Sequence, residues 1–192
     1  MLGRRVDDLP VGDWIYEPKW DGFRCLAFRS GAEVDLRSRH DRPLARYFPE
    51  LVGDLRELRA EPFVLDGEIV VPGPAGFHFD ALLARVHPAA SRVERLSRET
   101  PAEFVAFDVI AHDGEDLRER PFRERRALLS ALIGESSASV RVTSATEDRA
   151  VAAHWLAGAG GGIDGVMAKA GDLRYRPGAR AMLKVKPERT AD

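Results

Sequence analysis

Short apolar runs bounded by polar residues recur along the whole chain, and they indicate β-strands. Several of these runs are rich in β-branched and aromatic residues, which favour extended backbone. The predicted strands cover residues 14–16, 25–28, 63–71, 104–111, 140–143, 165–168 and 181–185. The Asp113-Gly114 pair that follows the fourth run is typical of a tight turn between antiparallel strands.

Apolar positions at helical spacing separate these strands. Pro49 suits the first turn of a helix that continues through Leu58, and further helices are predicted over residues 79–86, 122–133 and 147–156. The glycine-rich stretch 158–162 ends the last helix and is predicted to be a plain linker. Strands and helices do not alternate regularly, so the pattern favours an α+β fold with largely antiparallel sheets flanked by helices.

Composition limits the class of protein. The chain has 192 residues, of which 44% are hydrophobic, so it can bury the core of one domain. A formal net charge of -2 excludes a polybasic arm but permits a basic groove balanced by acidic residues elsewhere. A single cysteine, Cys25, excludes an internal disulfide framework and a cysteine-rich zinc module. The sequence has no apolar stretch of membrane-spanning length and no signal-peptide pattern, so we expect a soluble cytoplasmic protein.

The basic residues are divided unequally between two types. The chain contains 25 arginines and only four lysines, which are Lys19, Lys169, Lys184 and Lys186. Codon bias explains an excess of arginine, but it does not explain why four positions remain lysine. An amine becomes a nucleophile when it is neutral, whereas a guanidinium keeps its proton. The segments around the four lysines are therefore the candidates for chemistry.

Each lysine lies in or beside a short motif that has two interpretations. Segment 17–24, Glu-Pro-Lys-Trp-Asp-Gly-Phe-Arg, is either a catalytic motif or a charged hairpin with an Asp-Gly turn. Asp66 and Glu68 interrupt the apolar run 63–71, where a carboxylate is costly unless it faces a cleft, a metal or a cation. Lys184 and Lys186 share one face of a strand, as a functional pair of amines or as the guard of an edge strand.

The common phosphate-binding loops are absent from the sequence. It contains neither GxxxxGK[ST] nor GxGxxG, and the glycine run 158–162 lacks the lysine and hydroxyl that a phosphate loop needs. A nucleotide bound by this chain is therefore held by other means.

In this order, the segments resemble the motif series of the covalent nucleotidyltransferases, which include ATP-dependent DNA ligases, RNA ligases and mRNA capping enzymes. The resemblance is strongest to the adenylation domain of ATP-dependent DNA ligases, and among these to the small bacterial ligases of the C type. It extends from Tyr16 to Thr190, and all four lysines occupy motif positions. It implies the DNA ligase/mRNA capping enzyme nucleotidyltransferase fold, an ATP-grasp-like α+β architecture, with residues 1–192 as the adenylation domain.

The resemblance makes Lys19 the nucleophile. Its amine would attack the α-phosphate of ATP, expel pyrophosphate and keep AMP as a covalent lysyl-AMP. An ordinary lysine requires about 4.6 kcal/mol to be neutral at pH 7, and burial beside other cations lowers that cost. An arginine would require at least about 7.5 kcal/mol. AMP would then pass to the 5′-phosphate of a DNA nick, which the 3′-hydroxyl seals during repair.

The resemblance also assigns residues to the nucleoside and the nick. Glu17 would accept a hydrogen bond from the adenine amino group, and Phe107 would stack on the base, although a core aromatic is the simpler alternative. Arg24 and Arg39 would hold the ribose and the 5′-phosphate of the nick, and their alternative is two exposed arginines. Glu68 would contact the ribose.

Charge at the phosphates would come from lysines and from a divalent cation. Lys169, Lys184 and Lys186 would neutralise the phosphates, while Glu68 and Asp164 would hold Mg²⁺ or Mn²⁺. The family usually has glutamate where this chain has Asp164, whose carboxylate is withdrawn by one C–C bond, about 1.5 Å. Mg²⁺ commonly keeps several waters, which can bridge that difference.

The implied partners are nicked double-stranded DNA and end-joining or repair proteins, with no membrane, and we expect a monomer. The resemblance further implies a C-terminal OB-fold domain in cis, absent from these 192 residues. Two alternative functions stay open. One is an RNA ligase or a GTP-using capping-type transferase, and the other is a nucleotide- or nucleic-acid-binding module without turnover.

Three further groups have simple interpretations. Cys25 is predicted to be a buried thiol without chemistry. The five histidines show no metal-ligand spacing: His40, His78, His87, His112 and His154. The arginines between residues 118 and 126 alternate with acidic residues, which indicates a solvated helix face, with a nucleic-acid patch as the alternative.

Overall fold

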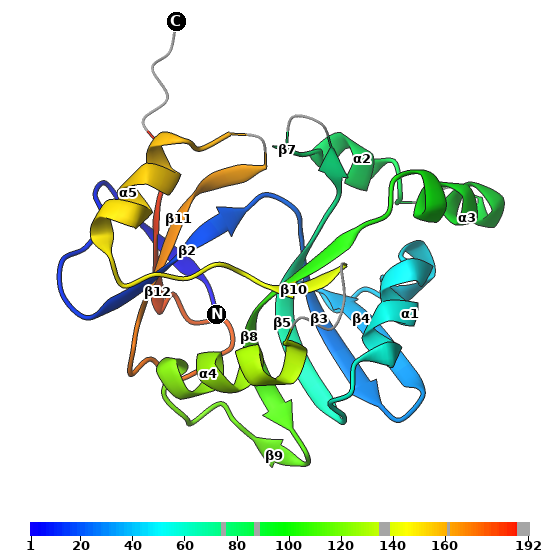
Figure 1. Ribbon diagram of the computed structural model, residues 1–192, viewed down its shortest axis with the longest axis horizontal. Helices are drawn as coiled ribbons and strands as arrows, with labels where there is room; N and C mark the ends of the chain where they lie inside the picture. The colour runs from blue at the N-terminus through cyan, green and yellow to red at the C-terminus, as the bar shows by residue number, and fades with distance from the viewer. Residues whose placement is uncertain (74–75, 87–88, 135–138, 161, 188–192) are drawn as a thin grey trace, which may run out of the picture.

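Two β-sheets with flanking helices form the protein (Figure 1). The computed structural model describes residues 1–73, 76–86, 89–134, 139–160 and 162–187. The four-stranded sheet has the strand order β1-β12-β11-β2. Its strands are β1 (Gly3–Val6), β2 (Trp14–Trp20), β11 (Ile163–Ala170) and β12 (Met182–Val185). Because β12 lies between β1 and β11, Lys184 does not guard an edge strand, and that alternative is wrong.

The six-stranded sheet has the order β10-β8-β5-β3-β4, with β9 paired to β8. Its strands are β3 (Phe23–Ser30), β4 (Glu33–Ser38), β5 (Phe63–Val70), β8 (Glu103–His112), β9 (Glu115–Asp116) and β10 (Val140–Val142). Strands β6 (Pro72–Gly73) and β7 (Gly76–Phe77) form a separate small hairpin. Only the β1–β12 and β8–β10 pairs of the described strands are parallel, so the predicted α+β class with largely antiparallel sheets is confirmed.

Helices bury the apolar residues of both sheets. The main core packs one face of the six-stranded sheet against α1 (Pro49–Glu57), α3 (Ala90–Glu99) and α4 (Phe122–Ile133). A smaller core packs the four-stranded sheet against α5 (Arg149–Ala157), which lies over that sheet in Figure 1. Helix α1 begins at Pro49, as predicted, and buries Leu51 and Leu55 completely. No helix in the described ranges is long and apolar enough to cross a membrane.

The sequence patterns did not predict every helix and strand. The predictions omitted β1, β4 and α3, and α3 is easy to miss because Val93 is its one buried residue. Helix α2 (Phe79–Leu83) is shorter than the predicted 79–86, since Arg85 turns inward and donates to the carbonyl oxygen of Tyr47. A short 3₁₀ helix, η1 (Ala45–Tyr47), precedes α1. The Asp113-Gly114 turn joins β8 to β9, as predicted.

The Asp21-Gly22 pair does not make a hairpin. Strand β2 belongs to the four-stranded sheet and β3 to the six-stranded sheet, so the chain crosses from one sheet to the other at this dipeptide. The Asp21 N–H donates to the carbonyl oxygen of Gly162 at 2.9 Å. A Cβ atom on Gly22 would lie 2.2 Å from the carbonyl oxygen of Ile69, so only glycine fits there. The hairpin interpretation of segment 17–24 is therefore wrong.

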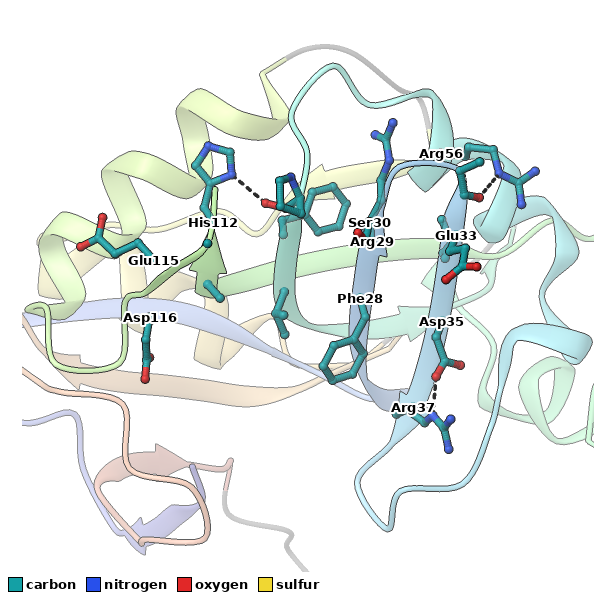
Figure 2. A pocket seen from close by; sticks show the side chains of 17 residues that line it. Phe28, Arg29, Ser30, Glu33, Asp35, Arg37, Arg56, His112, Glu115 and Asp116 are labelled. Carbon is teal, nitrogen blue, oxygen red and sulfur yellow. Dashed lines mark hydrogen bonds and ion pairs between the residues drawn. The ribbon is translucent and has the colours of Figure 1, made fainter.

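A cavity of about 870 Å³ lies on the six-stranded sheet away from the lysine motifs (Figure 2). Phe28, Val64 and Ala111 are paired in register across β3, β5 and β8 and form its apolar floor. Charged side chains such as Glu33, Asp35 and Arg37 surround it. No candidate catalytic or nucleotide-binding residue lines this cavity.

Candidate active site

A second cavity, of about 250 Å³, lies where the two sheets meet and collects most of the residues that the motifs singled out. Its lining includes, from both sheets, Glu17, Lys19, Arg24, Arg39, Glu68, Phe107, Lys169 and Lys184. Glu17 and Lys19 both face it because they are two residues apart on β2. The remaining two candidates, Asp164 and Lys186, lie beside the cavity and are joined to it through Lys19.

Lys19 and Lys186 converge on one carboxylate. Lys19 Nζ donates to Asp164 Oδ2 at 2.6 Å, and Lys186 Nζ lies 2.5 Å from the same oxygen. Burial raises the pKa of Asp164, but the hydrogen bonds from Lys186 and Lys19 outweigh it and hold this pKa below its ordinary value. Gly165 has φ of +127° at a bulge in β11, which turns Asp164 out of the regular strand alternation.

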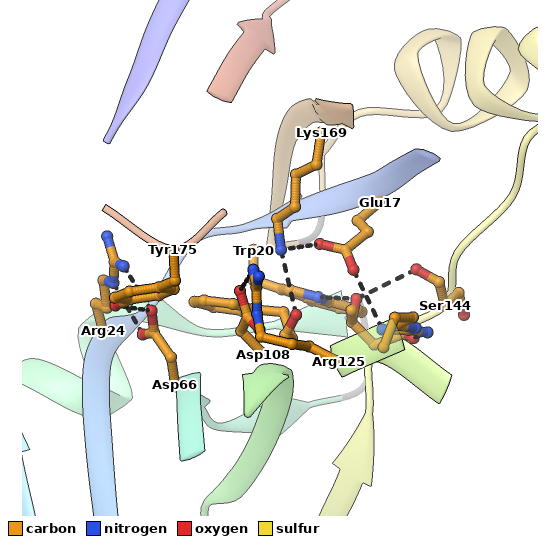
Figure 3. A network of polar contacts seen from close by, with 12 residues as sticks. Glu17, Trp20, Arg24, Asp66, Asp108, Arg125, Ser144, Lys169 and Tyr175 are labelled. Carbon is orange, nitrogen blue, oxygen red and sulfur yellow. Dashed lines mark hydrogen bonds and ion pairs between the residues drawn. The ribbon is translucent and has the colours of Figure 1, made fainter. Parts of the chain in front are cut away.

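Arg24 is fixed by a buried carboxylate. Its Nε and Nη2 donate to the two oxygens of Asp66 at 3.0 and 2.6 Å, and the Tyr175 hydroxyl donates to Asp66 Oδ2 at 2.8 Å (Figure 3). Burial lowers the pKa of Arg24, but the Asp66 carboxylate more than compensates and raises it. Asp66 thus faces a cation, one of the three conditions under which its apolar strand tolerates it. Sequence reasoning missed Tyr175, because the segment around it carries no periodic signal.

Glu68 lies in the same cavity between two cations. Burial raises its pKa to about 8, although Lys19 and Arg24 oppose that rise. With this pKa the carboxyl group of Glu68 is largely protonated at neutral pH, and a bound divalent cation would favour its ionised form.

Glu17 and Lys169 form a buried ion pair at the other side of the cavity. Lys169 Nζ lies 2.7 Å from Glu17 Oε2 and donates to the Phe107 carbonyl at 3.2 Å (Figure 3). Arg126 of α4 donates to the second oxygen of Glu17 at 3.2 Å. Burial raises the pKa of Glu17 above its ordinary value, against the opposing charges of Lys169 and Arg126.

Phe107 presents its ring to the cavity between two cations. It is half-buried, while its strand neighbours Ala106 and Asp108 are fully buried. Its ring centroid lies 4.9 Å from Lys169 Nζ and 5.7 Å from the guanidinium carbon of Arg24. The ring is therefore available to a flat ligand and is not part of the apolar core.

The arginines of the 118–126 segment do not form one solvated face. Arg125 is completely buried, and its guanidinium binds both oxygens of Asp108 at 2.8 and 2.9 Å. Arg126 is half-buried and reaches Glu17. The solvated-face prediction holds for Arg118 and Arg120, which pair with exposed acids, and is wrong for Arg125 and Arg126.

A divalent cation is compatible with the carboxylates of this cavity. No cluster of three or more potential protein ligands exists among the described residues. Mg²⁺ needs only one or two carboxylates when substrate phosphates and waters complete its shell. Glu68, whose pKa is raised by burial, and Asp164 fit this requirement.

A third cavity, the basic hollow, has a volume of about 690 Å³. It adjoins the active-site cavity and shares Arg24, Arg39 and Glu68 with it. It also carries Arg42 and Arg46, and Glu68 is the one carboxylate among its described lining residues. The near-neutral chain thus concentrates positive charge beside the cavity.

Comparison with known proteins agrees with this geometry. The family model described as "ATP dependent DNA ligase domain" matches residues 4–186. DNA ligase C2 of Mycolicibacterium smegmatis is 49% identical over 193 residues, which cover 100% of this chain and 54% of that protein. DNA ligase C of Mycobacterium tuberculosis is 47% identical over 197 residues, which cover 100% and 55%. The chain therefore spans about half the length of these relatives.

Solved structures share the fold. The ligase domain of LigD from M. tuberculosis superimposes with a TM-score of 0.73 at 31% identity, over 96% of this chain and 59% of that one. A mycobacterial DNA ligase D solved with ATP and MES gives a TM-score of 0.68 at 30% identity, over 96% and 60%. The predicted nucleotidyltransferase fold and the resemblance to C-type bacterial ligases are both confirmed. This chain belongs to the family of ATP-dependent DNA ligase domains.

Proposed function

We propose that this chain is the catalytic adenylation domain of an ATP-dependent DNA ligase and that Lys19 carries AMP. The position of Lys19 carries the proposal. Its amine lies in the cavity between the sheets, paired with Asp164, and the same cavity holds Phe107 and Glu17. A related mycobacterial ligase binds ATP in its solved structure, which supports ATP as the nucleotide.

The proposed nucleotide runs across the cavity. Adenine stacks on Phe107 with its amino group toward Glu17, and the ribose lies near Arg24 and Glu68. The phosphates point toward Lys19. The resemblance implies this order, and the presence of the aromatic ring, the carboxylates and the amines in one cavity supports it.

Two lysines of the last strand segment are the proposed phosphate ligands. Lys184 lines the cavity, and Lys186 binds the carboxylate that also holds Lys19. The resemblance implies that Lys169 binds the phosphates. In the structure its side chain is only 2% exposed and its ammonium is paired with Glu17. We propose that Lys169 acts beneath the base, as the counter-charge of that carboxylate.

The reaction itself forms one bond and breaks another. The neutral amine of Lys19 forms a bond to the α-phosphorus, the bond from that phosphorus to the pyrophosphate oxygen breaks, and the proton that the nitrogen releases passes to the adjacent Asp164 carboxylate. Asp164 holds the amine at 2.6 Å, which orients it before the attack. Mg²⁺ or Mn²⁺ held by Glu68 and Asp164 would screen the negative charge of the phosphates.

Nicked double-stranded DNA is the proposed second substrate. Arg39 borders both the cavity and the basic hollow, where Arg42 and Arg46 add further positive charge. We propose that the 5′-phosphate of the nick binds at Arg39, because phosphate contacts supply most of the affinity for DNA. A C-terminal OB-fold, end-joining or repair proteins as partners, a monomeric state and a cytoplasmic location are further proposals that rest on the resemblance.

Incubation with α-labelled nucleotide tests the function. Intact mass after incubation with ATP and Mg²⁺ should increase by one AMP, and peptide mapping should place the adduct on Lys19. Lys19→Ala should form no adduct. Label retained only from GTP would favour the capping-type alternative, and the absence of any adduct would favour a binding module.

A further inference from the structure

The carboxylate of Glu17 is held by cations from two different elements. Lys169 of β11 approaches Oε2 at 2.7 Å, and Arg126 of α4 donates to Oε1 at 3.2 Å. Arg126 also donates to the carbonyl oxygen of Thr143, a buried residue that follows β10. The guanidinium is therefore held between Glu17 and the backbone. Both oxygens of the carboxylate are fixed in place.

We propose that Arg126 is a positioning residue for purine selection, which keeps Glu17 charged and oriented so that the site accepts adenine and rejects guanine. The proposal rests on the proposed function and deepens it, because Glu17 is the residue expected to contact the base. Arg126 itself has no place in the cavity lining, so it acts through Glu17.

The chemical difference between the two purines explains how this works. Adenine presents an amino donor where guanine presents a carbonyl acceptor. An ionised carboxylate only accepts hydrogen bonds, whereas a neutral carboxyl group also donates one. Charged Glu17 therefore pairs with the adenine amino group and repels the guanine oxygen. A neutral Glu17 would tolerate both bases.

The surroundings of Glu17 make its charge depend on its partners. Burial raises its pKa, Lys169 and Arg126 lower it, and Asp108 of β8 raises it slightly further. Asp108 is itself neutralised by Arg125 of α4. Removal of the Arg126 charge leaves Lys169 alone against burial, so a larger fraction of Glu17 is protonated, most of all at low pH.

A purely structural role for Arg126 would give a different result. The residue also joins α4 to the segment after β10, and loss of that link would slow adenylation from every nucleotide equally. Purine selection is altered only if the orientation or charge of Glu17 changes. The ratio of kcat/KM for ATP to kcat/KM for GTP therefore separates the two roles.

The test compares Arg126→Gln and Arg126→Met with wild type, at pH 6 and pH 8, by the rate of covalent labelling from each nucleotide. We expect the ATP-to-GTP ratio to fall by about tenfold or more, because a hydrogen bond to a charged group is lost, and to fall further at pH 6 than at pH 8. Arg126→Lys, which keeps the charge, should restore most of the ratio. Arg123→Gln on the same helix, whose partners Asp13 and Glu147 are exposed, should leave it unchanged.

Methionine fills the space of the arginine stem without a buried polar end, so one of the two neutral variants is expected to fold. Glu17→Gln, which presents an amide donor, should lower the ratio without pH dependence. An unchanged ratio in folded Arg126 variants, or full ATP preference in Glu17→Gln, would overturn the proposal. Absence of an adduct from wild type would instead refute the proposed function.

Discussion

The ammonium groups of Lys19 and Lys186 lie on the same oxygen of Asp164, at 2.6 and 2.5 Å. Strand β11, which carries Asp164, pairs with β2 on one side and with β12 on the other, so its carboxylate is within reach of both lysines. The carboxylate of Asp164 therefore connects the proposed nucleophile to a second cation. Because both ammonium groups bind the same oxygen, the position of each lysine depends on the position of the other.

Asp164→Asn should slow formation of lysyl-AMP by about 100-fold or more, because the amide cannot hold two ammonium groups or a divalent cation. Asp164→Glu should keep most of the activity, since it keeps the carboxylate and lengthens the side chain by one methylene. The single-turnover rate of covalent labelling measures both. Asp172→Asn is the control, because Asp172 is exposed just beyond β11. A wild-type rate in Asp164→Asn would refute any role for this carboxylate in the reaction.

Glu68 makes the stability of the protein depend on pH in a direction opposite to that of most carboxylates. Its pKa in the folded state is about 8, above the ordinary 4.5, so the folded chain binds this proton more tightly than the unfolded chain does. The contribution is complete below pH 4.5 and is lost as the pH rises through 8. Between pH 5 and pH 9, wild type should lose on the order of 3 kcal/mol of unfolding free energy relative to Glu68→Gln.

Chemical denaturation at a series of pH values measures this difference. Glu33→Gln is the matched control, because Glu33 is exposed and its variant should follow the wild-type pH profile. Identical pH profiles for Glu68→Gln and wild type would show that Glu68 is already ionised at neutral pH. Bound Mg²⁺ should reduce the loss at high pH, since it favours the ionised carboxylate.

Local patterns predicted most strands, because an apolar run is a property of a few neighbouring positions, and the resemblance supplied the roles of the candidate site residues. The local patterns could not predict how the strands divide between two sheets. The Asp21-Gly22 dipeptide has the same local signal in a hairpin and in a crossing, and only the approach of Gly22 to Ile69 in another strand decides between them. Likewise the sequence around Arg125 and Arg126 is typical of surface charges. Their partners, Asp108 on β8 and Glu17 on β2, are distant in the sequence and are known only from the structure.

Tyr175→Phe should weaken nucleotide binding through Asp66 and Arg24. Loss of the hydroxyl leaves Asp66 Oδ2 with Arg24 alone and should reduce stability by about 1–2 kcal/mol. It should also raise KM for ATP more than it lowers kcat, because Arg24 is the proposed ribose ligand. Tyr16→Phe is the control, since the Tyr16 hydroxyl donates a partly buried hydrogen bond to the carbonyl oxygen of Pro10 and Tyr16 does not line the cavity. Equal KM values for ATP in Tyr175→Phe and Tyr16→Phe would show that Tyr175 does not contribute to nucleotide binding.

Phe107→Ala should raise KM for ATP by about tenfold, because stacking on an aromatic ring contributes about 1–3 kcal/mol per base. The ring is half-buried in the cavity lining, so its removal should have little effect on the free energy of unfolding. Phe104 on the same strand is fully buried in the main core, and Phe104→Ala should instead destabilise the fold by about 3–5 kcal/mol. Labelling kinetics and denaturation of the two variants separate these effects. Strong destabilisation of Phe107→Ala with unchanged KM would show that Phe107 stabilises the fold and does not bind the nucleotide.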